Sequence, residues 1–130
     1  MKHKTAELSG ALLDAAVAMA EGRVFDLHRM APHGADFLTV VDPEQSGWVT
    51  WSPSRLWEDG GPIIERERIS LFAPDRADGM WKAVIRTSDN KPLSMYADPA
   101  RPLIAAMRAY VVSKLGEDVD LSKVGADPQA

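Results

Sequence analysis

The sequence predicts an α+β domain in which one antiparallel sheet of about four to six short strands is flanked by an N-terminal and a C-terminal helix. Apolar residues recur at three-and-four spacing near the start of the chain and again near its end, as expected on one face of a helix. Between these regions lie short segments rich in β-branched and aromatic residues, separated by turn residues. Such segments are typical of strands.

The two helices are predicted over residues 5–22 and 102–115. Ser9 is a candidate N-cap, whose hydroxyl would accept a hydrogen bond from a free amide of the first turn, and Gly22 suits the left-handed position that ends a helix. Pro102 is well tolerated at a helix start, because the N–H that it lacks would have no intrahelical partner there. Gly116 follows the expected end of the second helix.

Six segments are predicted as strands, and they cover residues 23–28, 36–41, 48–51, 69–72, 80–86 and 93–96. The alternation is cleanest in residues 80–86, where Trp81, Ala83 and Ile85 would share one face. Asp89 and Asn90 then provide a turn. We therefore expect residues 80–86 and 93–96 to pair as an antiparallel hairpin.

A chain of 130 residues is the right size for one domain, and we assign residues 1–121 to it. Residues 122–130 offer little that a core could bury, so we expect them to form a disordered tail. The chain has no cysteine, which excludes disulfides and thiolate chemistry. The three histidines lack the spacing of metal ligands on a helix, and we expect neither a metal nor a cofactor.

Charge and hydropathy limit where the protein acts. The net charge is -4 and the basic residues are scattered, so electrostatics argue against a role in binding nucleic acid. The chain has no apolar run of about 18 residues, the length that spans a bilayer. Its basic first residues are not followed by the apolar stretch of a signal peptide. We expect a cytoplasmic protein that does not enter the membrane.

A tryptophan-rich block stands out, because three of the four tryptophans, Trp48, Trp51 and Trp57, lie within ten positions just before a Gly-Gly-Pro sequence. Such rings often form the bulk of the core of a small domain, and this interpretation is favoured. Exposed rings would instead mark an interface or a ligand site. The residues that would form this site are Trp51, Ser52, Trp57, Glu65 and Arg66.

The charged run at residues 65–68 also has two interpretations. In a continuous strand over residues 63–72, Glu65 and Glu67 would face the core, where burial would raise their pKa and make them candidates for acid–base chemistry. A short helical turn opened by Pro62 would leave the charges in water, with a strand starting near Ile69. The helical turn is favoured because it avoids burying two carboxylates.

Four segments of the chain, in order, carry a family resemblance. They read ELSGALLDAAVAMAEG, WSPSRLWEDGGPIIERERISL, WKA and PLIAAMRAYVVSKLGEDVDL. Together they resemble the NinX-like phage proteins, a family of phages and prophages that has no assigned biochemical function. The resemblance covers most of the chain and implies a phage or prophage accessory protein in the bacterial host cytoplasm. It brings no catalytic residues with it.

Three functions fit these observations. The favoured one is a non-catalytic interaction module that binds a host or phage protein, or forms a homo-oligomer, through the loop of residues 51–57. The alternative is a small-molecule-binding protein or small enzyme whose pocket brings Trp51, Ser52, Glu65 and Arg66 together. Ser52 has no evident base to activate it and is more simply a turn cap, as is Ser54. Weak stacking of single-stranded nucleic acid on exposed tryptophans is a third, less favoured function.

Overall fold

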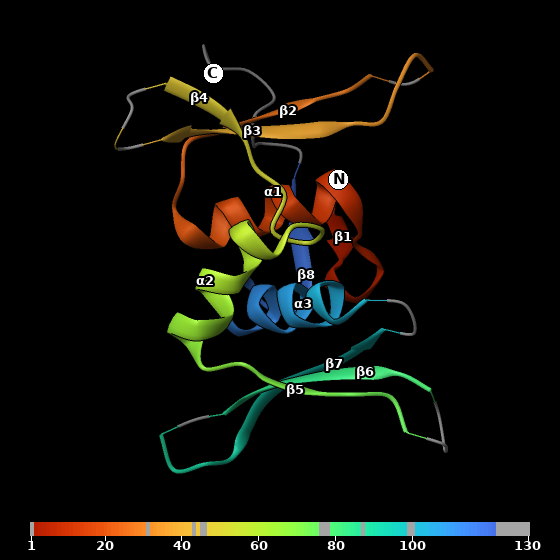
Figure 1. The fold of residues 1–130 in the computed structure, drawn as a ribbon, viewed down its shortest axis with the longest axis vertical. Helices are drawn as coiled ribbons and strands as arrows, with labels where there is room; N and C mark the ends of the chain where they lie inside the picture. Colours follow the sequence, from red (N-terminus) through yellow and green to blue (C-terminus); the bar gives the residue numbers. More distant parts are fainter. Residues whose placement is uncertain are drawn as a thin grey trace.

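The helices of the protein lie between two three-stranded sheets (Figure 1). The computed structural model describes residues 2–30, 32–42, 44, 47–75, 79–86, 88–98 and 101–121, with the backbone alone for residues 94–96. The helices are α1 (Gly10–Glu21), α2 (Trp57–Glu67) and α3 (Pro102–Leu115), and a short 3-10 helix, η1 (Thr5–Glu7), precedes them. The strands are β1 (Lys2–Lys4), β2 (Phe25–His28), β3 (Phe37–Asp42), β4 (Gly47–Thr50), β5 (Ser70–Phe72), β6 (Trp81–Arg86), β7 (Pro92–Asp98) and β8 (Asp118–Asp120).

The α+β class is confirmed, and the strands are divided among three antiparallel sheets where the sequence predicted one. Two sheets have the strand orders β2-β3-β4 and β5-β6-β7, and β1 pairs with β8. Helix α1 packs against β2 and β3, whereas α3 packs against β6 and β7. Because α1 and α3 also pack against each other, each helix is covered on two sides and can bury a separate sheet.

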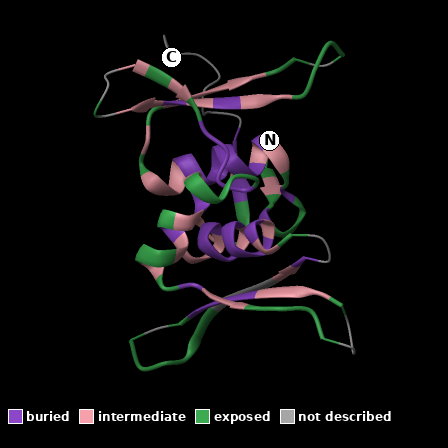
Figure 2. Cartoon of the chain, in the orientation of Figure 1, coloured by how far each residue is buried: buried purple, intermediate pink, exposed green. Residues whose placement is uncertain are grey.

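Small residues allow this double coverage. Both α1 and α3 are largely buried, whereas the exposed residues lie mainly in the turns and loops and on α2 (Figure 2). Six alanines in these two helices are at most 1 % exposed: Ala15, Ala16, Ala18, Ala105, Ala106 and Ala109. A helix that is apolar on more than one face is typical of a buried position. In the described part of the chain, no helix has both the length and the apolarity needed to cross a bilayer.

The expected helix ends are largely confirmed. The second helix spans Pro102–Leu115 as predicted, and the first is interrupted near its start, with η1 preceding α1. Ser9 is the N-cap of α1, but its side chain makes no capping hydrogen bond, so that part of the prediction is wrong. Gly22 adopts a φ of 71° and its amide bonds to the carbonyls of Ala18 and Met19, which is the expected glycine cap.

The six predicted strands are present with small shifts of their ends, and the hairpin of β6 and β7 pairs Ala83 with Tyr96. The sequence did not predict β1 and β8. These strands pair Lys2 with Asp120 and Lys4 with Asp118, so opposite charges lie across the ladder and favour the pairing. Strands of three residues from opposite ends of the chain leave no periodic signal. The predicted tail, residues 122–130, lies outside the described residues.

Helix α2 confirms the favoured helical interpretation of residues 65–68 and extends it. The sequence predicted that the helix starts at Pro62, but it begins five residues earlier, at Trp57. Gly60 makes this path possible, since a Cβ there would lie 2.4 Å from the carbonyl oxygen of Pro53. Pro62 is tolerated because the carbonyl that loses its partner belongs to Glu58, an exposed residue whose backbone can bond to water.

Candidate functional site

A buried polar network holds the first half of the tryptophan-rich block in place. Asp14, in the middle of α1, is 1 % exposed. One of its carboxylate oxygens accepts a hydrogen bond from the Ser52 hydroxyl at 2.9 Å, and the other accepts from the Ser54 amide, also at 2.9 Å. A buried carboxylate is stable only when its oxygens are bonded in this way. Asp14 therefore anchors residues 52–54 to α1.

The protonation of Asp14 is shifted by its surroundings. Burial raises the pKa of Asp14 above its ordinary value, and the hydrogen bonds from Ser54 and Ser52 and the charge of Arg55 oppose that rise. Desolvation is the dominant cause because it penalises the charged carboxylate directly.

Further contacts connect the same loop to α2. The Ser52 amide donates to Asp59 at 2.9 Å, and the Ser52 carbonyl accepts from the Leu56 amide at 2.8 Å. The turn is thus held by two carboxylates that accept from backbone amides, where the sequence predicted serine hydroxyls as caps. Trp51 is only 7 % exposed, and the Arg23 guanidinium carbon lies 4.9 Å from the centre of its ring, within the range of a cation–π interaction.

The second half of the block is exposed. Trp57, the first residue of α2, is 54 % exposed, and Leu56 before it is also exposed. Trp57 borders a shallow pocket of about 120 Å³. We call this region the Trp57 surface, and it comprises Arg55, Trp57, Arg101, Pro102 and Leu103.

The Trp57 surface combines an exposed ring with two cations. Arg55 donates from Nε to the Ser52 hydroxyl at 2.9 Å, and the Arg101 amide donates to Asp98 at 2.9 Å. Neither guanidinium forms a salt bridge within the described residues. An exposed aromatic ring beside two arginines is a composition enriched in protein interfaces.

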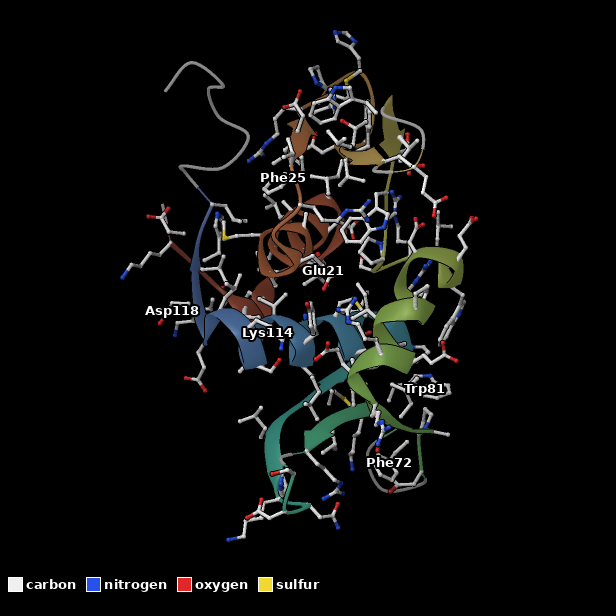
Figure 3. All side chains as sticks on the ribbon, turned by 90° about the vertical axis from the view of Figure 1, so that its left-hand side faces the viewer. Glu21, Phe25, Phe72, Trp81, Lys114 and Asp118 are labelled. Atoms are coloured by element: carbon white, nitrogen blue, oxygen red, sulfur yellow. The ribbon has the colours of Figure 1, made fainter. Side chains whose placement is uncertain are left out.

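Glu65 and Arg66 lie near the other end of α2, and both are exposed. Arg66 bridges two helices, because its terminal nitrogens donate to the two carboxylate oxygens of Glu21 at 3.0 and 2.5 Å. Tyr110 of α3 donates its hydroxyl proton to the same Glu21 carboxylate. Figure 3 shows Glu21 between α1 and α3, with Lys114 on α3 nearby.

The charges of this cluster shift one another's protonation. The hydrogen bonds with Glu21 and Glu67 raise the pKa of Arg66, and the hydrogen bond from Arg66 lowers the pKa of Glu67. Burial, together with the hydrogen bond to the Glu21 carboxylate, raises the pKa of Tyr110. These groups are fixed in one protonation state near neutral pH, which suits a cross-link between helices better than proton transfer.

The five predicted site residues do not converge on one pocket. Trp51 and Ser52 are buried, Trp57 is exposed, and Glu65 and Arg66 lie about two turns further along α2. Among the described residues, no three His, Cys, Asp or Glu side chains come close enough together to hold a metal ion.

Sequence reasoning missed Asp14 and Arg101. Asp14 is preceded by Leu13 and followed by Ala15 within a buried helix, and a carboxylate on such an apolar face signals a buried partner. Arg101 carries no comparable signal, because its proximity to Trp57 depends on how α2 packs against α3.

The fold and the Trp57 surface define a small α+β protein with an exposed aromatic and cationic patch next to a buried, hydrogen-bonded loop. A family model described as Bacteriophage P22, NinX matches residues 4–114, so the chain belongs to the NinX family of phage proteins. The resemblance noted in its sequence is thereby confirmed. A search of curated proteins finds no match to the chain.

Proposed function

We propose that this phage protein is a non-catalytic interaction module that binds a protein partner through the Trp57 surface. The observation that carries the proposal is the 54 % exposure of Trp57 beside Arg55 and Arg101, which line the same pocket and form no salt bridge within the described residues. Tryptophan and arginine are the residue types that most often dominate binding energy at interfaces.

The chemistry of the patch suggests the kind of segment that binds. The exposed indole ring and the half-buried Pro102 offer apolar contact, and the guanidinium groups of Arg55 and Arg101 attract a carboxylate. A fitting partner presents an Asp or Glu next to an aliphatic or aromatic side chain. We propose a host or phage protein as the partner, in the bacterial host cytoplasm, and a homo-oligomer as the competing arrangement.

The buried half of the block supports a scaffolding role for the residues beneath this surface. The Ser52 hydroxyl is engaged by Asp14 and by Arg55, which leaves Ser52 poorly suited to bind a ligand or attack a substrate. A small-molecule site or enzyme built on Trp51, Ser52, Glu65 and Arg66 therefore has less support than an interaction surface.

Affinity capture from bacterial lysate, with and without phage infection, tests the proposal. We expect Trp57→Ala and Arg101→Glu each to weaken retention of a specific partner by about tenfold or more, because central Trp and Arg residues contribute at least about 2 kcal/mol to binding. Trp48→Ala is the matched control, since Trp48 is similarly exposed, at 56 %, but lies on β4.

The decisive comparison is between the two tryptophan variants. Retention that is lost in Trp57→Ala and kept in Trp48→Ala supports the proposal, provided that both variants melt at the wild-type temperature. Equal retention by both would remove the Trp57 surface from consideration. Sedimentation of the purified protein separates the two kinds of partner, because a homo-oligomer dissociates on dilution without any lysate component.

A further inference from the structure

A second pocket lies at the opposite end of α2 from Trp57. Its volume is about 460 Å³, and we call it the arginine pocket. Its walls are Arg66, Glu67, Arg68, Arg86, Ser88 and Asn90. The C-terminal end of α2 lies above the turn that joins β6 to β7 (Figure 1), so the pocket combines residues from two separate parts of the chain.

Glu67, the one carboxylate among the described residues that line this pocket, is already compensated. Glu67 accepts a hydrogen bond from Arg66 Nε at 2.9 Å and lies 3.5 Å from the Lys114 ammonium group. Arg66 is in turn bonded through its other nitrogens to Glu21. These ion pairs neutralise the charges of Arg66 and Glu67 within the protein. The remaining cations among the described lining residues are Arg68 and Arg86.

Arg68 and Arg86 supply uncompensated positive charge. Neither forms a salt bridge in the described part of the chain, and the hydrogen bond recorded for Arg86 runs to the Asn90 carbonyl at 3.5 Å. Two such cations in one pocket contrast with the net charge of -4 of the whole chain, and they attract an anion. The helix dipole at the end of α2 opposes this attraction. It is weakened because the amides of Arg68 and Ile69 already bond to the last helical carbonyls.

The backbone at the pocket is unusual. Arg68 ends α2 in the left-handed conformation, with φ 53° and ψ 49°, a position where glycine is the common residue. Asn90, on the opposite wall, has a φ of 67°, which asparagine adopts more easily than other side chains. An arginine held in this conformation is strained, and strained residues concentrate where side chains are used in binding.

We propose that the arginine pocket binds the phosphate group of a small molecule, with Arg68 and Arg86 as the principal ligands. The planar guanidinium group donates two parallel hydrogen bonds to phosphate oxygens. The Ser88 hydroxyl and the Asn90 side-chain amide supply further donors. The volume lies within the range of small-molecule sites, so the phosphate is either free or part of a molecule of nucleotide size.

Calorimetric titration of the full chain at constant ionic strength tests this site. The two probes are inorganic phosphate and adenosine 5'-monophosphate. We expect at least the nucleotide to bind at millimolar concentration or below, and binding of both with similar affinity would identify the phosphate alone as the recognised group. Arg86→Gln should weaken binding about tenfold, the factor that corresponds to losing one charge-assisted hydrogen bond.

Two variants separate loss of binding from loss of fold. Arg68→Gly suits the left-handed backbone, so it should remain folded while also losing about tenfold in affinity. Arg29→Gln is the matched control, because the Arg29 side chain is 64 % exposed on a different hairpin, and its affinity should stay within about twofold of wild type. Trp57→Ala should likewise bind as wild type, since this site does not depend on the Trp57 surface.

Three results would overturn the phosphate site. One is the absence of heat from either probe at millimolar concentration with a folded protein. Another is unchanged affinity in the folded Arg68→Gly variant. The third is binding of a single-stranded oligonucleotide without binding of either small probe, which would indicate attraction to a polyanion and no site for one phosphate group.

Discussion

Residues 51–54 and helix α2, which we call the buried half and the exposed half of this region, differ in what surrounds them. All four residues of the segment 51–54 are buried, and Asp14 accepts hydrogen bonds from Ser52 and Ser54. Helix α2, the exposed half, presents Trp57 at one end and Arg68 at the other, with few residues buried between. A single conspicuous stretch of sequence therefore contains both a scaffold and the surfaces that the scaffold supports. Conspicuous residues next to each other in sequence need not share a role.

The largest expected effect comes from the point where the two halves touch. Gly60→Ala would place a Cβ 2.4 Å from the Pro53 carbonyl oxygen and 2.8 Å from a methyl carbon of Leu103. We expect the variant to lose about 3 kcal/mol of unfolding free energy, as overpacking against backbone does. Urea denaturation measures this loss. Gly61→Ala is the control, because a Cβ there meets no atom within 4 Å, and a loss as large in the control would contradict the packing argument.

The anchor of the buried half gives the next effect. Asp14→Ala leaves the Ser54 amide and the Ser52 hydroxyl without their buried acceptor, and we expect a loss of about 2 kcal/mol in unfolding free energy. Part of the cost is offset because the variant no longer buries a charge. Asp14→Asn keeps an acceptor and the shape, so it should lose less. If both variants unfold at the wild-type urea concentration, the network does not hold the loop.

The pH dependence of stability should have opposite signs in the two halves. The pKa of Asp14 is raised in the folded protein, so its contribution to stability is full below the ordinary value of 3.8 and declines as the pH rises toward the folded pKa. The pKa of Glu67 is lowered, so its contribution is present above the ordinary value of 4.5 and is lost as the pH falls through the folded pKa.

Denaturation of the wild type, Asp14→Asn and Glu67→Gln across this pH range measures the two contributions. As the pH rises from below 3.8, Asp14→Asn should gain stability relative to the wild type, and Glu67→Gln should lose it. If the unfolding free energies of all three proteins changed in parallel with pH, that result would contradict the claim that Asp14 is destabilised by desolvation while Glu67 is stabilised by its ion pairs.

A smaller effect is expected at the end of the exposed half. Arg68→Gly relieves a left-handed backbone, and we expect it to raise the unfolding free energy by about 0.5 kcal/mol, because glycine adopts this conformation without a steric cost. The melting temperature measures the change. A clear decrease would mean that the Arg68 side chain contributes to folding, and that loss of anion binding in this variant reflects lost stability.

The sequence predicted the elements whose signals are local. Helix α3 begins at Pro102 and ends before Gly116 as expected, because both residues act on the backbone beside them. The start of α2 was missed because Gly60 and Pro62 are residues that usually break helices. The reason for a glycine at position 60, its close contact with Pro53, is visible only in the structure. The pairing of β1 with β8 joins opposite ends of the chain, and no sequence window contains both.

The candidate site was predictable in part for the same reason. Trp57 could be selected from its position in an aromatic cluster, and the structure places it at the surface. Its companion Arg101 belongs to the start of α3 and reaches it only through tertiary packing. The burial of Trp51 and Ser52 likewise depends on Asp14, which precedes Ser52 by 38 residues.

Partner retention by Trp57→Ala, compared with Trp48→Ala at equal melting temperature, tests the central claim most directly. The exposed ring of Trp57 contributes little to folding, so its removal should change the unfolding free energy by no more than about 0.5 kcal/mol. We predict that Trp57→Ala remains folded and loses its partner, and that Trp48→Ala keeps it. A folded Trp57→Ala that retains every wild-type partner at wild-type strength would contradict the account.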